Sequence, residues 1–373
     1  MRYRRLGRTG LLVSEIGFGG GGIGGVYGER SEEEAGRAVG RALELGVNFF
    51  DVAPAYGDGL AERVLGEALA GAREHVVIET KVALTEERFG DLNGFVRRSV
   101  EQSLSRLGTD YLDVLLVHNP LSSVRGRPVQ RPGDIQMVTA ADALAIGDEL
   151  RRLQEEGVVG FLGFTGWRCT RAALVELLDS GLFDVIQVEY NLFNQSAVEA
   201  PLPGQDVTPL ETLETDPDLD MAGWAYRPID QHLAISLATE RGVGVVCIRP
   251  LAAGLLSAQL DRPDEPGTQM DLLRRRAAAL SFLTERGGRT LAQAAFAFSL
   301  ANPSIATVIP GVKNAAEIED AVHAARAAPL DPETIERLTT LARSNFDAEK
   351  SPAAERSVLG PGLRVDRPGQ AGI

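Results

Sequence analysis

The sequence predicts an α/β fold, a closed parallel (β/α)8 barrel, on the strength of three observations. Short apolar segments typical of strands alternate with amphipathic segments typical of helices along the chain. Eight such units fill about 310 residues, which suits a barrel. Glycines that can end a helix precede several of the predicted strands. An open doubly wound sheet with a second domain remains the structural alternative, although such sheets usually have fewer strands and one topological switch point.

The predicted elements follow one another in a regular order. The predicted strands are short apolar runs at 15–18, 47–51, 75–80, 111–118, 158–164, 183–190, 242–248 and 306–310. The predicted helices lie at 31–45, 61–70, 91–107, 141–156, 170–179, 229–240, as a pair within 271–301, and at 314–326. Ser31, followed by Glu34, resembles a capping box, and Asp91 can cap the helix that begins at Leu92. The glycines that follow helical segments are Gly46, Gly108, Gly157 and Gly181.

Two segments are longer than ordinary connections between elements. They span about 119–140 and 191–228, and each follows the C-terminal end of a predicted strand. Barrel active sites are built on that face, so both segments are candidate lids or substrate walls. We expect a single domain over residues 1–345 that opens with a short β-hairpin. The Pro-, Gly- and Arg-rich tail, 346–373, is expected to be mobile or to fold back over the active-site face.

The composition of the 373 residues narrows the classes of function. The chain is 44% hydrophobic and 24% charged, and its formal net charge is −14. Because this charge repels phosphate backbones and anionic lipids, we expect neither a nucleic-acid nor a membrane partner. The two cysteines are too few for a disulfide framework, and the opening residues are not followed by the apolar run of a secretory signal. We therefore expect a cytoplasmic protein that acts on a small molecule.

The glycine-rich stretch IGFGGGGIGG, residues 16–25, matches the G-x-G-x-x-G pattern of dinucleotide-binding turns. In a true fingerprint the third glycine lies in the first turn of the helix, where the pyrophosphate docks. Here the predicted helix begins only after Ser31. Asp51, about 30 residues on, imitates the ribose-binding acid of that motif, so a Rossmann dehydrogenase stays open as a rival. A flexible glycine loop at the barrel mouth, which lets a ligand approach the backbone, is favoured.

At the next motifs the chain resembles the aldo-keto reductase superfamily, over about residues 1–345. The opening MRYRRLGRTGLLVSEIGFGG is similar to the N-terminal hairpin and first strand of that family, and FFDVAPAYGDGLAERVLGEAL resembles its best-known signature. The resemblance implies an NADP-dependent TIM-barrel oxidoreductase that reduces carbonyl groups. The catalytic tetrad implied by the resemblance is Asp51 in FFDVAPAYG, Tyr56 in the same loop, Lys81 in ETKV and His118 in LLVHNP.

Physical chemistry supports this set of four independently of the family. Asp51, Lys81 and His118 each end one of three adjacent predicted strands, and Tyr56 lies in the loop after Asp51, so all four can meet at one barrel mouth. A phenol with a pKa near 10 exchanges protons slowly at neutral pH, and a nearby ammonium lowers that pKa. We expect Lys81 to do this, Asp51 to keep Lys81 charged, and His118 to hydrogen-bond the substrate oxygen. Tyr56 is then the general acid in reduction and the base in alcohol oxidation.

The resemblance also implies a nicotinamide cofactor, because protein groups alone cannot carry a hydride. Thr165 and Gln187 would hold its carboxamide, although Gly166 stands where the family usually has Asn. Ile248 or Arg249 occupies the place of an aromatic residue that stacks on the ring in many relatives. The remaining expected cofactor contacts are the turn Pro250, Leu251 and Gly254, and the helix start Lys313, Asn314 and Glu317. Lys313 suits a 2′-phosphate, so NADP(H) is favoured over NAD(H).

The substrate side of the site is expected to be aromatic. The candidate wall residues are Tyr27, Trp167, Trp224 and Tyr226, with Phe193 as a further aromatic candidate. Such walls suit an apolar or sugar-like carbonyl compound, and the acidic run ETLETDPDLDM disfavours a strongly anionic one. The four histidines form no zinc pattern, so we expect no metal. A second class stays open, a catalytically weak nucleotide-binding subunit that senses redox state, like the channel-associated members of the superfamily.

Overall fold

Eight parallel strands form the centre of the computed structural model, which describes residues 1–26, 31–85, 90–125, 135–211, 228–257, 269–285 and 288–347. These strands are β3 (Phe18–Gly19), β4 (Phe49–Asp51), β5 (Val77–Val82), β6 (Leu112–Val117), β7 (Val159–Thr165), β8 (Val185–Glu189), β9 (Gly244–Ile248) and β10 (Ile305–Ile309). They are hydrogen-bonded in the order β10-β9-β8-β7-β6-β5-β4-β3, and every pair is parallel. The strand order follows the chain order, as in a barrel.

The sheet is closed by contacts between its first and last strands. Gly17 N donates to Val308 O at 3.0 Å, and Val308 N donates to Glu15 O at 2.9 Å. A parallel bridge also joins Gly19 to Gly311. The predicted (β/α)8 barrel is therefore confirmed, and the open doubly wound sheet is wrong. The Rossmann reading of the glycine stretch falls with that sheet.

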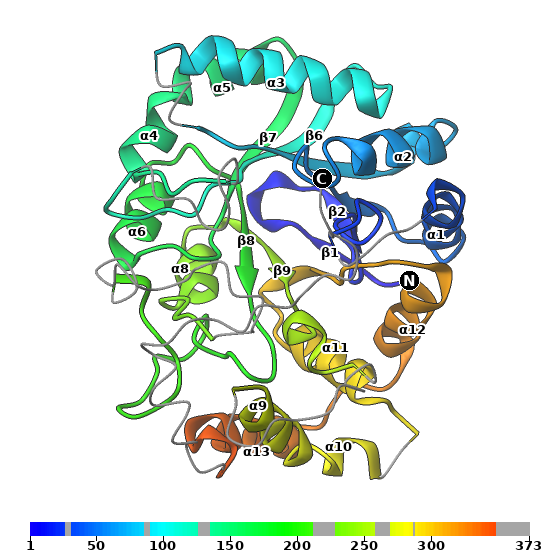
Figure 1. Ribbon diagram of the computed structural model, residues 1–373, viewed down its shortest axis with the longest axis vertical. Helices are drawn as coiled ribbons and strands as arrows, with labels where there is room; N and C mark the ends of the chain where they lie inside the picture. Colours follow the sequence, from blue (N-terminus) through cyan, green and yellow to red (C-terminus); the bar gives the residue numbers. More distant parts are fainter. Residues whose placement is uncertain are drawn as a thin grey trace, which may run out of the picture.

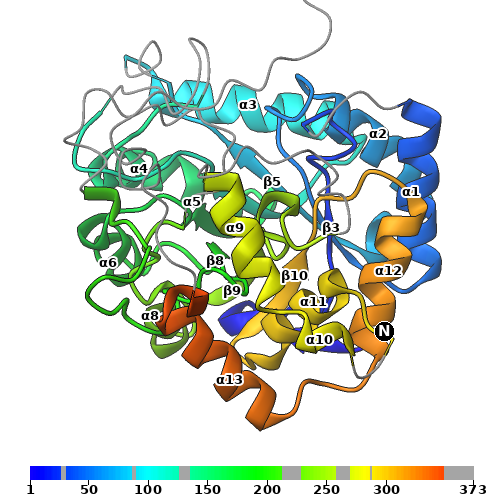
Figure 2. The ribbon, with the colours of Figure 1, turned by 60° about the horizontal axis from the view of Figure 1, so that its bottom comes forward.

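The helices form a ring around the barrel (Figures 1 and 2). They are α1 (Glu32–Glu44), α2 (Leu60–Leu69), α3 (Leu92–Leu107), α4 (Ala140–Ala145), α5 (Gly147–Glu155), α6 (Arg171–Asp179), α8 (Ala234–Glu240), α9 (Gln269–Ala278), α10 (Phe282–Glu285), α11 (Leu291–Ala301), α12 (Ala315–Arg326) and α13 (Pro332–Arg343). Helix α1 packs against both α2 and α12, which closes the ring. Helices α9, α10 and α13 lie at the lower edge of Figure 1, outside this ring.

The ends of the helices have the expected chemistry. Ser31 Oγ accepts a hydrogen bond from Glu34 N at 3.1 Å, and Asp91 Oδ1 accepts one from Gly94 N at 3.1 Å. The glycines expected after helices all adopt the left-handed backbone conformation, with φ between 64° and 85°: Gly46, Gly108, Gly157 and Gly181. A residue without a Cβ enters this conformation at little cost, so the chain can turn there into the next strand.

Three helical predictions need correction, and one helix is additional. The pair expected within 271–301 is three helices, α9, α10 and α11. The helix expected at 141–156 is two helices, α4 and α5, because the backbone leaves helical geometry at Ile146 (φ −90°, ψ 2°). The helix expected at 229–240 begins at Ala234, because His232 and Leu233 have positive φ. Helix α13 was not predicted at all. Its start carries a strong signal, with Asp331 as the N-cap and Pro332 in the first turn.

The predicted N-terminal hairpin, β1 (Tyr3–Arg5) and β2 (Leu12–Ser14), is present and covers the N-terminal end of the barrel. Leu6 between its strands is fully buried and belongs to the barrel-interior cluster with Phe49 and Val114. The Arg4 guanidinium donates to the carbonyl oxygens of Leu300, Asn302 and Ile305 at 2.8 to 3.1 Å. The hairpin thus fills the end of the barrel opposite the predicted site.

Candidate active site

The interior of the barrel changes from apolar to polar toward the C-terminal ends of its strands. Val77 at the start of β5 belongs to the apolar interior cluster. Glu79 and Lys81, on the same face of that strand, are also buried but carry ionisable side chains. Asp51 ends β4, directly beside β5. Gln187 of β8 reaches the same interior from across the barrel. The polar groups therefore meet at the face where barrel enzymes carry their sites.

Lys81 and Asp51 form a buried ion pair. Lys81 Nζ donates to Asp51 Oδ1 and, at 2.8 Å, to Val52 O, and the lysine side chain is 1% exposed. Burial lowers the pKa of Lys81, but the negative charge around it, above all that of Asp51, outweighs this effect and raises the pKa above its ordinary value. Lys81 is therefore an ammonium throughout the working pH range.

Tyr56 and His118 complete the group of four. The Lys81 ammonium lies 5.0 Å from the centroid of the Tyr56 ring. The Tyr56 and His118 rings meet edge to face, with centroids 5.9 Å apart and an interplanar angle of 84°. Burial, and then the positive charge of Lys81, lower the pKa of His118 well below its usual value. The structure thus brings the four residues together, with a cationic lysine and a neutral histidine flanking one phenol.

Gln187 faces two buried carboxyl groups. Its Nε2 donates to Asp51 Oδ1 at 2.7 Å and to Glu79 Oε1. Its expected role toward a nicotinamide carboxamide stays a prediction, and this amide already has two acceptors inside the barrel. Glu79 was missed by the sequence reading. Its place two residues before Lys81 was the available signal, because residues i and i+2 of a strand share a face.

Thr165, at the end of β7, provides a test of whether the site suits a cofactor amide. Its hydroxyl is buried and has no hydrogen-bond partner within the described part of the chain. A buried hydroxyl without a partner is costly, so a polar ligand group at this position would satisfy it. At the neighbouring Gly166 an added Cβ would lie 2.7 Å from Ile186 Cδ1 and 3.1 Å from Gln187 O. The small residue there allows the β7 and β8 ends to approach closely.

Arg249 and Trp167 lie together beside this end of the barrel. Arg249 Nε is 3.0 Å from Glu189 Oε2, and Glu189 is 1% exposed. Two guanidinium carbons lie near the centroid of the Trp167 ring: that of Arg168 at 4.3 Å and that of Arg249 at 5.0 Å. Such cation–π contacts hold the half-buried indole in place, so Trp167 can form a rigid wall.

The turn after β9 has unusual backbone geometry. Positive φ angles occur at Arg249 (53°), Ala252 (48°), Ala253 (58°) and Gly254 (94°). Non-glycine residues with positive φ are uncommon and tend to occur where function requires strain. Pro250 and Leu251 lie inside this strained turn. The expectation that it binds a pyrophosphate stays a prediction.

Lys313 and Asn314 precede helix α12, as predicted. Asn314 Oδ1 accepts from Glu317 N at 3.1 Å and caps the helix, whereas Lys313 Nζ lies 3.0 Å from Glu317 Oε1. Their proposed roles toward the adenosine phosphate are not tested by these contacts. Gly22 lies against this segment, because an added Cβ would lie 2.0 Å from Val312 O. The glycine-rich stretch thus serves close packing of the β3 loop on the end of β10.

Three of the predicted wall residues lie outside the described residues: Tyr27, Trp224 and Tyr226. Phe193 is buried and packs edge to face against Phe346 with ring centroids 5.4 Å apart, so it is a core residue. Phe346 is accordingly anchored, although the sequence reading put it at the start of the tail.

Within the described ranges, no group of three or more His, Cys, Asp or Glu side chains is arranged to hold a metal ion. No helix in the same ranges is both long and apolar enough to span a membrane.

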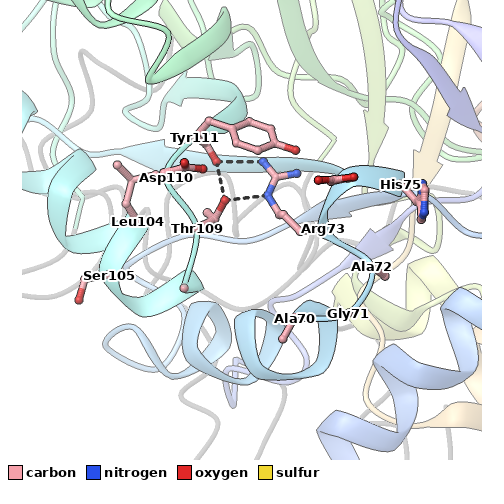
Figure 3. A pocket seen from close by; sticks show the side chains of 12 residues that line it. Ala70, Gly71, Ala72, Arg73, His75, Leu104, Ser105, Thr109, Asp110 and Tyr111 are labelled. Atoms are coloured by element: carbon pink, nitrogen blue, oxygen red, sulfur yellow. Dashed lines mark hydrogen bonds between the residues drawn. The ribbon is translucent and has the colours of Figure 1, made fainter.

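A surface pocket lies at the opposite end of β5 and β6 from the candidate site (Figure 3). It is lined by Ala70, Gly71, Ala72, Arg73, Glu74, His75, Leu104, Ser105, Gly108, Thr109, Asp110 and Tyr111. The Arg73 guanidinium stacks 3.7 Å from the Tyr111 ring centroid and donates to Thr109 Oγ1 and Tyr111 O. These contacts tie two loops together at the face that serves stability in barrels.

Comparison with known proteins agrees with this geometry. The model of the Aldo/keto reductase family matches residues 15–204 and 205–343. The chain is 30% identical over 350 residues to L-galactose dehydrogenase of Arabidopsis thaliana, covering 91% of this chain and 94% of that protein. It is 25% identical over 357 residues to a probable voltage-gated potassium channel subunit beta of the same plant, covering 88% and 93%.

Solved structures share the fold. The crystal structure of an aldo-keto reductase from Klebsiella pneumoniae in complex with NADPH matches with a TM-score of 0.60 at 22% identity, covering 92% of this chain and 95% of that one. Since the family model covers most of the chain, the protein is a member of the aldo/keto reductase family.

Proposed function

We propose that this protein is an NADP(H)-dependent oxidoreductase that interconverts an aldehyde or ketone and the corresponding alcohol by hydride transfer. The observation that carries the proposal is the buried Lys81–Asp51 ion pair, whose ammonium lies 5.0 Å from the Tyr56 ring centroid. Separate support comes from the relatives, which include a dehydrogenase and a reductase bound to NADPH.

Tyr56 is the proton donor in this proposal. The Lys81 ammonium stabilises the phenolate of Tyr56, which makes the phenol a better acid when a carbonyl oxygen is reduced. In the reverse direction the phenolate removes the proton of the alcohol. His118 is neutral because its pKa is lowered, so its imidazole donates a hydrogen bond to the substrate oxygen without competing as an acid.

The cofactor supplies the hydride that the chain itself cannot provide. Thr165 and Gln187 would hold its carboxamide, and the buried Thr165 hydroxyl without a partner in the described chain supports that role. Arg249, Pro250, Leu251 and Gly254 would follow the pyrophosphate. Lys313, Asn314 and Glu317 would hold the adenosine end, where the lysine ammonium suits a 2′-phosphate and favours NADP(H) over NAD(H).

The substrate class that suits the site is a neutral carbonyl compound. Trp167, held by its contacts with Arg168 and Arg249, would be one wall of the pocket for the apolar or sugar-like substrate that the sequence predicts. The acidic sequence of the second insertion disfavours a strongly anionic one.

A turnover assay with Tyr56→Phe tests the proposal. Purified protein is mixed with NADPH and a panel of neutral aldehydes, and the loss of reduced cofactor is followed. We expect turnover that falls on the order of 100-fold or more in Tyr56→Phe, since the general acid is lost. Tyr3→Phe is the matched control, because Tyr3 is 48% exposed on the hairpin.

The outcome also separates the two classes of function. Tight NADPH binding with no Tyr56-dependent oxidation of the cofactor would favour a regulatory nucleotide-binding subunit. One relative is named as a probable voltage-gated potassium channel subunit beta.

A further inference from the structure

Glu79 is a second carboxyl group inside the barrel, in the layer below Lys81. It lies on β5 and is completely buried. Glu79 is paired in register with Asp51 of β4, so the two acidic side chains point into the same interior. Gln187 Nε2 donates to Asp51 Oδ1 at 2.7 Å and also to Glu79 Oε1, so the two carboxyl groups lie close together. The resemblance to the aldo-keto reductase superfamily assigns no role to Glu79.

The contacts of Glu79 are those of a neutral acid. Gln187 Nε2 donates to its Oε1, but its Oε2 has no partner among the residues described here. In the same part of the chain no ion pair joins Glu79 to a cation, since Lys81 is paired with Asp51. An ionised carboxylate accepts hydrogen bonds only, so two carboxylates cannot bond each other, whereas a protonated carboxyl has one donor to give.

The neighbouring elements offer no other charge to balance Glu79. On β6, the residue beside it in register is Val114. Thr80, on the outer face of β5, bonds Glu62 of α2, and Glu62 is paired with Arg106 of α3 at 2.6 Å. That outer pair is complete without Glu79.

The charge balance of the interior follows from these contacts. Asp51 and Lys81 cancel each other, and His118 is neutral, so an ionised Glu79 would add an uncompensated negative charge. Burial, and then the charge of Asp51, raise the pKa of Glu79 well above its usual value, although Lys81 opposes this.

We propose that Glu79 is a positioning residue that remains protonated in the working enzyme and donates its proton to Asp51. In this arrangement Lys81, Gln187 and Glu79 all hydrogen-bond Asp51. The Lys81 ammonium then faces Tyr56, and the Asp51 carboxylate alone balances its charge. Ionised Glu79 would add a negative charge near Tyr56, oppose its phenolate and slow alcohol oxidation. The catalytic consequence rests on the proposed function, whereas the protonation state does not.

Infrared spectroscopy tests the protonation state without substrate or cofactor. At neutral pH we expect the carbonyl-stretch band of a protonated carboxylic acid in the native protein and in Glu62→Gln, and its loss in Glu79→Gln. Glu62 is the matched control because it is equally buried but paired with Arg106. If Glu79→Gln leaves the acid band unchanged, the proposal is overturned.

The pH dependence of alcohol oxidation tests the positioning role. Glutamine keeps a neutral donor, so we expect Glu79→Gln to retain kcat/KM within about threefold near neutral pH. The fall in kcat/KM at alkaline pH that the ionisation of Glu79 causes should be absent from this variant. Glu79→Ala removes the donor and should lower kcat on the order of tenfold. A Gln variant as impaired as the Ala variant would show that a carboxylate is required and would refute the role. If Tyr56→Phe proves fully active, the proposed function fails, while the infrared result on Glu79 stands by itself.

Discussion

Replacing Lys81 by methionine removes the ammonium beside Tyr56 while keeping an unbranched side chain that is one atom shorter. The ammonium lies 5.0 Å from the centroid of the Tyr56 ring. At that separation a unit charge stabilises a phenolate by about 3 kcal/mol with an effective dielectric constant near 20. This energy corresponds to about a 100-fold change in an equilibrium constant. We therefore expect Lys81→Met to raise the pKa of Tyr56.

The direction of the effect differs between the two reactions. Alcohol oxidation requires the phenolate, so at neutral pH its kcat/KM should fall about 100-fold in Lys81→Met, because the phenolate fraction falls with the higher pKa. The rise of the oxidation rate with pH should move to higher pH. The assay is kcat/KM for NADP⁺-dependent oxidation of an alcohol across the stable pH range, with circular dichroism to verify folding.

Tyr56→Phe supplies the control for this measurement, because the pH limb that belongs to the phenol must disappear in that variant. If Lys81→Met lowers the rate but leaves the limb at its native pH, then Lys81 does not act through the pKa of Tyr56. The proposed role of the ammonium would then be wrong.

Three further predictions concern pH, packing and the cofactor. The pKa of His118 is lowered, so its NMR signal should not titrate between about pH 8 and 6. Below about pH 6.5 the unfolded chain binds a proton at His118 that the folded protein does not, so the free energy of unfolding should fall there. Gly66→Ala should destabilise the fold by about 1–3 kcal/mol in urea unfolding, because its Cβ would lie 2.4 Å from Leu107 O. Lys313→Ala should weaken NADPH binding about tenfold in a fluorescence titration while NADH binding stays the same.

Each of these has a matched comparison. Gly36 in α1 has nothing within 4 Å of an added Cβ, so Gly36→Ala should stabilise the fold by up to about 1 kcal/mol. Equal effects of the two glycine variants would contradict the packing argument. A His118 signal that titrates near its ordinary pKa would contradict its burial beside Lys81. Equal losses of NADPH and NADH affinity in Lys313→Ala would remove the case for a 2′-phosphate contact.

The fold could be predicted because its signals are local. Apolar runs, helix-capping side chains and glycines with positive φ each mark an element by nearby residues, as at Ser31 and Gly108. The division between α4 and α5 has no such signal, because Ile146 is neither glycine nor proline. The start of α13 does carry a local signal, an N-cap at Asp331 followed by Pro332, but a regular alternation of eight strands and helices predicts no helix there.

The candidate site could be predicted only in part. Asp51, Tyr56, Lys81 and His118 stand in an ordered set of motifs, so their convergence followed from the fold. Gln187 is different, because its acceptors on β4 and β5 lie across the barrel and no local pattern indicates them. Glu79 was hidden for a related reason. An acidic residue in an apolar run usually marks the exposed face of a strand, but β5 is buried on both faces.

The seam between β3 and β10 has a consequence for how the chain reaches its native state. The first barrel strand has one partner soon after it in the sequence, but its other edge is bonded, within the described part of the chain, by residues 308–312. During synthesis on a ribosome, that edge stays open until nearly the whole barrel has emerged. Pairing so distant in sequence slows folding and leaves backbone groups free to join other chains. Fragments that stop before residue 305 should therefore aggregate.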